Sequence, residues 1–520
     1  MILTLVTFIP AAGAVLLMLL PRNDRIIRAV ALAVSLLAFA FSVFLPMNFA
    51  GGQSGFQFEV NHPWIGQAIH YHLGADGISM WLVLLTTLLV PLSVLISWKS
   101  IHDRVKEFFV LLLLLETAMI GVFVSLDMFL FYVFWEATLI PMALLIGMYG
   151  HERRVYAAVK FFLYTMVASV FMLGAIIYLY TQTHSFDYTV IQAALASSSN
   201  YAFSPSVLQW LFLGFFIAFA VKVPLFPFHT WLPDAHVEAP TAGSVLLAAV
   251  LLKMGTYGLL RFNVGLFPEQ ARRNAPWIIV LAIIGIIYGA LVALVQPNLK
   301  KLIAYSSVSH LGFVVLGIFT FTQMGTDGAV YQMLNHGIST GALFMLAGMI
   351  YERKHTYELS AYGGLATPMP VYATFFLIAV LSSVGLPLMN GFVGEFLVLS
   401  GAFQYKMLYG ILGTTGVIWG AAYLLWMYQN VFYGPIKHEE NNRLMDIGGR
   451  EQISLWPLAA MALIMGVASP FWMNSIDPAV AQTIKRTQQQ SPSAQLTNGS
   501  RTGAPVSPKQ PAASSMPGMK

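Results

Sequence analysis

Charged and titratable side chains interrupt hydrophobic runs that are long enough to cross a membrane. They are Glu116, Glu136, Lys222, Lys253 and Glu395, together with His229, His310 and His336. A charge at the centre of a membrane helix costs about 2.5–3.5 kcal/mol on insertion scales, so such residues are rare and usually mark ion or proton pathways. Residues of both signs on several helices therefore predict a proton path. The alternatives are static buried ion pairs and, for the histidines, simple polar contacts between helices.

Glu136 and Lys222 are the first candidate pair. Glu136 lies in FWEATLIPM and Lys222 in AVKVPLF, on different predicted helices. Removal from water disfavours the charged form of a lysine, whereas a nearby carboxylate favours it. If the two side chains meet, protonation or movement of the glutamate makes the lysine release its proton. A proton pump needs this behaviour from a lysine.

Two of the hydrophobic runs are broken beside an ionisable residue. Pro224 and Pro227 follow Lys222, and the stretch SSVGLPLMNGFVGEF breaks the helix just before Glu395. Proline frees backbone groups, which are tolerated at membrane depth only against protein or a water-filled cavity. Two broken spans of this kind are typical of a transporter built from inverted repeats.

The spacing of these residues supports a repeat. The separations from Glu136 to Lys222 and from His310 to Glu395 agree to within one residue. Glu136 would then correspond to His310, and Lys222 to Glu395. Consecutive repeats of five helices must be inverted in the membrane, although one pair of matching distances can also arise by chance.

Lys253 and the histidines extend the candidate path. In chain order, Lys222, Lys253, His310, His336 and Glu395 predict a series across the middle of the protein. Water would have to bridge the gaps, because a direct hydrogen bond reaches only about 3 Å.

The composition defines which elements must position these residues. The chain of 520 residues is 58% hydrophobic and 9% charged, against about 25% charged in soluble domains. It contains no cysteine, which excludes cysteine-ligated iron–sulfur clusters, thiolate zinc sites and disulfides, and it has no GxGxxG or P-loop motif. We therefore expect an all-α polytopic membrane protein whose redox chemistry, if any, takes place elsewhere.

Apolar runs near 20 residues predict about fourteen transmembrane helices, of which the seventh and twelfth are discontinuous. The runs are 2–20, 28–47, 78–98, 107–126, 128–149, 157–181, 207–232, 240–262, 275–296, 301–322, 329–351, 369–402, 409–433 and 453–474. The predicted parts are three N-terminal helices (1–106) with an outer loop (47–77), repeats at 107–262 and 275–433, a last helix (453–474) and a disordered polar tail (484–520). In the outer loop, FQFEV and AIHYHLG can pair as a hairpin.

The basic residues predict the orientation. Most lie in alternate loops, namely Arg22, Arg25, Arg28, Lys99, Arg104, Lys106, Arg153, Arg154, Lys160, Lys300, Lys301, Arg353, Lys354, Lys437, Arg443 and Arg450. Before the tail, the opposite loops hold only Arg261, Arg272, Arg273 and Lys406. The positive-inside rule then places both termini outside the cytoplasm and leaves no basic surface that indicates nucleic-acid binding.

Five motifs carry a resemblance to a known family. They are FWEATLIPM, KVPLFPFHTWLPDAHVEAPTAGSVLLAAVLLKMGTYG, LKKLIAYSSVSHLGF, LNHGISTGALFMLAGMIYERKHT and LPLMNGFVGEFL. Up to about residue 475 the chain resembles subunit M of bacterial NADH:quinone oxidoreductase, respiratory complex I. The long second motif is also shared by subunits of multisubunit cation/proton antiporters. One departure is GLPLMN, where the family pattern leads us to expect GLPGTN.

The resemblance implies a role for each candidate residue. Glu136 and Lys222 would be the coupling pair, Lys253 and His310 the central relay, His336 a further relay position, Glu395 the residue nearest the outward half-channel, and Glu116 a second glutamate near the fifth-helix site. His229 and His236 would be structural or lie at the channel mouth. His70 and His72 lack the surrounding ligands of a zinc site.

The resemblance also implies partners and location. The chain would hold no flavin, iron–sulfur cluster or quinone headgroup, and partner subunits would perform the redox chemistry. Its neighbours in the lipid bilayer would be other complex I membrane subunits, including the L and N types, in the bacterial inner membrane. Two alternatives stay open, a subunit of a cation/proton antiporter and a purely structural membrane scaffold.

Overall fold

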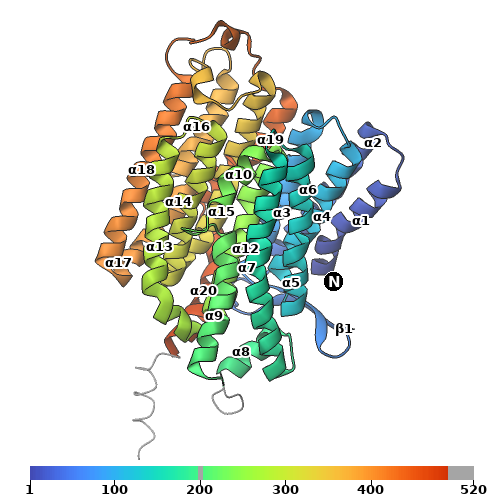
Figure 1. Cartoon of the computed structure of the whole chain (residues 1–520), viewed down its shortest axis with the longest axis vertical. Helices are drawn as coiled ribbons and strands as arrows, with labels where there is room; N and C mark the ends of the chain where they lie inside the picture. Colours follow the sequence, from blue (N-terminus) through green and yellow to red (C-terminus); the bar gives the residue numbers. More distant parts are fainter. Residues whose placement is uncertain (197–202, 490–520) are drawn as a thin grey trace, which may run out of the picture.

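The computed structural model describes residues 1–196 and 203–489, and this part of the chain is mostly helical (Figure 1). Within it, 12 helices are long and apolar enough to cross a membrane, or 13 if one bent pair counts as a single span. The prediction of an all-α polytopic membrane protein is confirmed. The exact number of fourteen crossings and the inverted repeats stay predictions.

The spans follow the predicted runs. They are α1 (Ile2–Leu19), α2 (Asp24–Asn48), α3 (Ser79–Ser100), α4 (Val105–Val124), α5 with α6 (Met128–Ala137, Leu139–Tyr149), α7 (Arg154–Thr183), α9 (Pro205–Lys222), a composite span Thr241–Val264, α13 (Pro268–Leu294), α14 (Leu299–Phe319), α15 (Gln323–Lys354) and α18 (Met407–Phe432). The bent pair consists of α19 (Gly449–Val467) and α20 (Pro470–Gln489), which meet at 70°. The predicted run 369–402 forms two shorter helices, α16 (Pro370–Val384) and α17 (Asn390–Tyr405).

Both predicted breaks are present. Helix α9 ends at Lys222, and helical structure resumes with α10 (Trp231–Glu238), while the Trp231 indole N–H donates to the Val221 carbonyl at 2.9 Å across the break. In the second break, the Ser382 hydroxyl donates to Asn390 Oδ1 at 2.5 Å. The side-chain amide of Asn335 on α15 donates to the Asn390 carbonyl at 2.8 Å. These bonds satisfy polar groups that membrane lipid could not satisfy.

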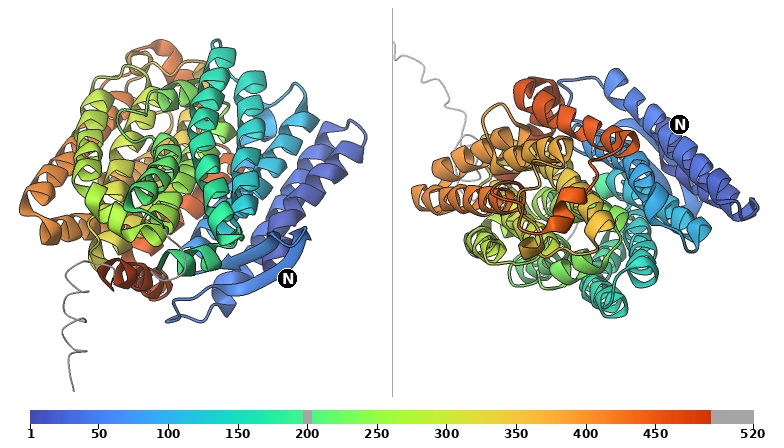
Figure 2. Two further views of the ribbon diagram at one scale, coloured as in Figure 1. Left: turned by 60° about the horizontal axis from the view of Figure 1, so that its bottom comes forward. Right: turned by 90° about the horizontal axis from the view of Figure 1, so that it is seen from above.

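The most buried spans lie in the middle of the helix assembly (Figure 2). Within an apolar stretch of 18 residues in each span, every residue of the composite span and of α15 is buried by the rest of the protein, against 94% of the residues in α14 and only 28% in α2. The composite span consists of α11 (Thr241–Leu246), η1 (Leu247–Leu251), α12 (Leu252–Gly258) and η2 (Leu259–Val264). The peripheral helices, α1, α2, α7 and α18, expose large apolar side chains, as expected of surfaces that face lipid.

The predicted hairpin is also present. Strands β1 (Gln57–Ile65) and β2 (Ile69–Ala75) pair antiparallel. They lie at the same end of the molecule as α8 (Tyr188–Ala196) and both ends of the described chain (Figures 1 and 2). Tyr71 on β2 donates to Thr4 at 3.0 Å, which fixes the hairpin to the start of α1.

The C-terminal tail differs in part from the prediction. Helix α20 continues through Gln489, so residues 484–489 are helical rather than the first part of a disordered tail. Helix α20 is amphipathic, and its apolar face buries Val480 and Ile484 against the rest of the protein. The rest of the predicted tail lies outside the described residues.

Candidate functional site

Lys222 occupies an aromatic site at the end of α9. The side chain is fully buried, and Nζ lies 5.4 Å from the ring centroids of both Trp135 and Phe161. Aromatic faces attract a cation, most strongly where water is excluded. Nζ has no hydrogen-bond partner among the described residues. The site therefore holds a lysine whose charge is supported by rings rather than by a fixed counter-ion.

Glu136 lies beside this site but forms no ion pair with Lys222 in the described part of the chain. It follows Trp135 on α5, is half-buried, and its charge acts on Lys222. Within the described ranges, no ion pair of 4.0 Å or less joins the two side chains. The helix is interrupted directly afterwards at Thr138, whose hydroxyl donates to the Trp135 carbonyl at 2.8 Å. Glu136 and Lys222 therefore lie near each other without a fixed ion pair.

Lys253 lies at the centre of the protein in direct contact with His336. Its Nζ is 2.5 Å from His336 Nδ1 and donates to the Ala248 carbonyl at 2.6 Å. Both side chains are at least 99% buried. Helix α12, which carries Lys253, is flanked by the π-helical segments η1 and η2, a geometry that is frequent at functional sites. The amphipathic periodicity of the sequence gives no signal for these π-segments.

His310 and Glu395 form a second direct contact. His310 Nδ1 lies 2.7 Å from Glu395 Oε1, and the same oxygen accepts a bond from Gln332 Nε2 at 2.9 Å. On its other side, His310 Nε2 lies 3.2 Å from the Tyr423 hydroxyl. The ring centroids of His310 and His336 are 6.0 Å apart, so the two contacts join into one series.

The spatial order of this series differs from the predicted chain order. It runs Lys253, His336, His310, Glu395, because α15 packs between the composite span and α14. Gln332 and Tyr423 also belong to the site, although the sequence did not predict them. Gln332 lies one helical turn before His336, a spacing that places both on one face of α15 and could have indicated it. No pattern in the sequence indicates Tyr423.

Three predicted site residues, Glu116, Glu136 and Lys222, stand apart from the series, as does His229. Glu116 on α4 is fully buried, and neither of its carboxyl oxygens has a hydrogen-bond partner in the part of the chain that is described. No hydrogen bond connects Lys222 to Lys253 in that part either, since Lys222 Nζ has none. His229 packs against the rings of Phe226 and Tyr288.

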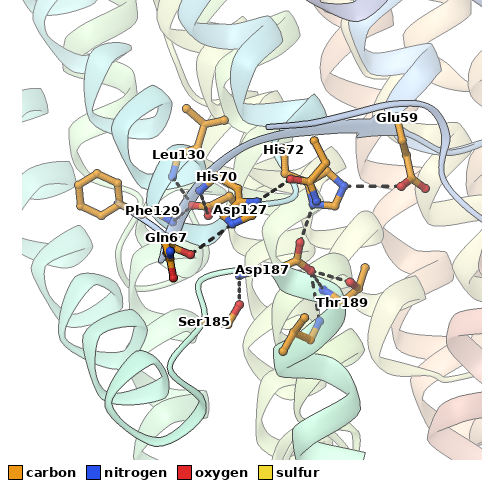
Figure 3. Close-up of polar contacts among 12 residues, drawn as sticks. Glu59, Gln67, His70, His72, Asp127, Phe129, Leu130, Ser185, Asp187 and Thr189 are labelled. Atoms are coloured by element: carbon orange, nitrogen blue, oxygen red, sulfur yellow. Dashed lines mark hydrogen bonds and ion pairs between the residues drawn. The ribbon is translucent and has the colours of Figure 1, made fainter. Parts of the chain in front are cut away.

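The hairpin histidines have separate hydrogen-bonding partners (Figure 3). His70 Nδ1 lies 2.6 Å from Asn61 Oδ1, and His72 Nδ1 lies 2.6 Å from Asp187 Oδ2. Among residues 1–196 and 203–489, no group of three or more His, Cys, Asp or Glu residues is arranged to hold a metal ion. The two histidines thus act as hydrogen-bonding residues of the hairpin.

The fold and the buried Lys/His/Glu series define a class, the antiporter-like membrane proteins with broken helices and intramembrane titratable residues. Residues 125–419 match the family described as NADH:quinone oxidoreductase/Mrp antiporter, transmembrane, and the chain belongs to this family.

Individual relatives narrow the resemblance to subunit M. The chain is 46% identical over 495 residues to "NADH-quinone oxidoreductase subunit M" of Rhodobacter capsulatus, covering 93% of this chain and 96% of that protein. It is 39% identical to "NADH-ubiquinone oxidoreductase chain 4" of Marchantia polymorpha, covering 92% and 96%. The predicted resemblance to subunit M is thereby confirmed.

Two solved structures have the same fold as this chain. A chain of respiratory complex I from Thermus thermophilus superimposes with a TM-score of 0.85 at 33% identity, covering 93% of this chain and 99% of that one. A chain of an archaeal membrane-bound sulfane sulfur reductase has a TM-score of 0.80 at 23% identity, which shows a shared fold.

Proposed function

We propose that this chain is a proton-translocating membrane-arm subunit of NADH:quinone oxidoreductase. It moves protons through its buried Glu/Lys/His residues while partner subunits transfer electrons. The observation that carries the proposal is the series Lys253, His336, His310 and Glu395, which lies in or against the most buried spans and is joined by contacts of 2.5 and 2.7 Å.

Proton transfer along this series uses groups that can both accept and donate. A charged Lys253 donates a proton to His336 Nδ1, and His310 passes a proton to the Glu395 carboxylate. The step between the two histidine rings needs a ring rotation or a bridging water, since their centroids are 6.0 Å apart. Glu395 then releases the proton toward the end of the molecule that carries the hairpin.

Glu136 and Lys222 couple this series to the partner subunits. Movement of Glu136 toward Lys222 stabilises the charged lysine, and movement away weakens it. Moving one charge against 100 mV takes about 2.3 kcal/mol. Leaving one buried charge without its partner costs about 3–5 kcal/mol, so a change in the distance between Glu136 and Lys222 is of the size that a proton step requires. Glu116, fully buried on the neighbouring helix α4, is a second carboxylate through which the pair can respond.

The partners and location follow from the same proposal. Partner subunits carry the flavin and the iron–sulfur clusters, and this chain has no cysteine with which to ligate a cluster. Its neighbours are other complex I membrane subunits, including the L and N types, in a bacterial inner membrane. Both ends of the described chain lie at the end opposite the basic loops, which supports termini on the periplasmic side.

The second candidate is a subunit of a cation/proton antiporter, which the family description also covers. It predicts Na⁺-driven pH changes in membranes that lack a respiratory substrate. The redox-linked proposal predicts pH changes only when an electron donor is supplied.

Replacing Lys222 tests the proposal. In membrane vesicles that contain the assembled complex, Lys222→Met should abolish most proton pumping driven by deamino-NADH, because methionine fills the aromatic site without carrying a proton. Lys437→Met, a change at an exposed position in the loop after α18, should leave pumping unchanged. Near-normal pumping by an assembled complex that carries Lys222→Met would contradict the coupling role of Lys222.

A further inference from the structure

A pocket opens at the basic end of the molecule, away from the series of contacts described above. It has a volume of about 320 Å³ and is lined by Lys99, His102, His151, Tyr351, Glu352 and Tyr357, among others. These residues come from the end of α3 and the loop after it, the turn between α6 and α7, and the end of α15 with the loop after it. The pocket is open to water and rich in titratable groups.

Lys300, near the start of α14, lies directly beneath this pocket. It is 1% exposed, and its Nζ lies 5.1 Å from the ring centroid of Tyr357, which lines the pocket. Nζ donates to the Ala239 carbonyl at 2.6 Å and to the Val237 carbonyl at 3.4 Å, at the C-terminal end of α10. Glu238, the last residue of α10, supplies a negative charge that acts on Lys300.

His151 connects Lys300 to the wall of the pocket. Its Nδ1 lies 3.2 Å from the Tyr351 hydroxyl. Burial, together with the positive charge of Lys300, lowers the pKa of His151 to about 4. A neutral imidazole at the pocket can accept a proton from water and pass it on, and the influence of Lys300 on it shows that the two groups are electrostatic neighbours.

His236 lies between Lys300 and the central pair. It is fully buried on α10, and its ring stacks on Phe344 with centroids 4.3 Å apart. Neither ring nitrogen has a hydrogen-bond partner in the described part of the chain. The charges of both Lys300 and Lys253 act on this ring, and the ring in turn acts on His336. A buried imidazole without partners is costly, so this placement calls for a function.

We propose that Lys300 and His236 form an input branch, through which protons pass from the pocket at the basic end to the Lys253–His336 pair. This inference rests on the proposed function. Protonated Lys300 gives a proton to the neutral His236 ring, His236 gives it to neutral Lys253 or His336, and water in the pocket returns a proton to Lys300. Bridging waters span the gaps. Among the residues that the structure describes, Glu238 is the one carboxylate whose charge acts on this branch, so repulsion between the basic groups favours one proton at a time.

The alternative is a structural role, in which Lys300 only satisfies the carbonyls at the end of α10. Arginine separates the two roles, because it keeps the positive charge and the donors but cannot give up its proton. His236→Phe distinguishes proton transfer from a structural role at a second position. It keeps the stacking on Phe344 and loses no protein hydrogen bond, because neither nitrogen makes one.

The experiment compares proton pumping by assembled complexes in membrane vesicles, with deamino-NADH as the electron donor. Lys300→Gln, Lys300→Arg and His236→Phe should all lose most pumping. Lys301→Gln, at the next and only half-buried position, should behave as the unchanged protein. Normal pumping by Lys300→Arg would assign Lys300 a structural role, and normal pumping by His236→Phe would overturn the branch even if the Lys300 variants fail to assemble.

A further variant separates this inference from the proposed function. Lys253→Met interrupts the central series, whatever the input route. Loss of pumping in Lys253→Met with normal pumping in the Lys300→Arg and His236→Phe complexes would overturn only the input branch. Normal pumping in all of these variants would overturn the proposed function itself.

Discussion

At the scale of single residues, one glycine shapes the turn that precedes Glu395. Gly385 ends α16 with φ +79°, in the left-handed region that glycine adopts without a steric penalty. A Cβ at this position would lie 3.6 Å from Glu395 Oε2 and from Phe392 N, which is ordinary contact distance. The requirement for glycine is therefore conformational rather than spatial, and the turn brings the start of α17 back against α15.

Replacing this glycine should destabilise the broken span. Gly385→Ala should lower the free energy of unfolding by about 1–2 kcal/mol, the cost of the left-handed conformation for a residue with a Cβ. The thermal inactivation midpoint of the assembled complex measures the effect. Gly174→Ala, in the interior of α7 where no atom lies within 4 Å of the added Cβ, is the control and should not lower the midpoint. Equal midpoints for Gly385→Ala and the unchanged protein would contradict the conformational argument.

At the scale of elements, the hairpin is linked to the helix that carries Glu136. His72 on β2 contacts Asp187 at 2.6 Å, and Glu59 lies 3.6 Å from its other nitrogen (Figure 3). Asp127 caps α5 by accepting from Phe129 N, and its other oxygen accepts from His70 N, both at 2.9 Å. The hairpin, the loop before α8 and the first turn of α5 thus form one hydrogen-bonded unit.

This unit should depend on pH. Burial lowers the pKa of His72, but the hydrogen bond and charge of Asp187, with the charge of Glu59, outweigh burial and raise it overall. Burial of Asp187 is likewise outweighed by His72 and Thr189, so the pKa of Asp187 falls to about 2. The His72 contribution is fully present below about pH 6.5 and is lost as pH rises through its raised pKa. The Asp187 contribution is present above about pH 4 and is lost as pH falls toward 2.

Hydrogen exchange can measure this dependence. After correction for intrinsic rates, protection of the Tyr188 and Met128 amides, which bond to Leu126 and Phe186 across the unit, should be greatest between about pH 4 and 6.5 and decrease above that range. Asp187→Asn should remove most of the dependence. Protection that is constant from pH 5 to 9 in the unchanged protein would contradict the charge-based account.

At the scale of the whole molecule, the membrane is the reason why so much could be predicted. The cost of a charge in lipid marks Lys222, Lys253 and Glu395 in the sequence, and the need for about 20 apolar residues per span marks the helices. Which residues touch depends on how the helices pack, and that is not local. The contact of Lys253 with His336, the π-segments beside Lys253 and the position of Tyr423 therefore emerge only from the structure.

The buried series makes the central claim, that protons cross this subunit through Lys253 and His336, directly testable. The measurement is the number of protons pumped per deamino-NADH oxidised by assembled Lys253→Met complex in membrane vesicles, with Lys301→Met as the matched lysine control. The proposed mechanism predicts a clear fall in pumping for Lys253→Met and none for Lys301→Met. Unchanged pumping by a fully assembled Lys253→Met complex would contradict it.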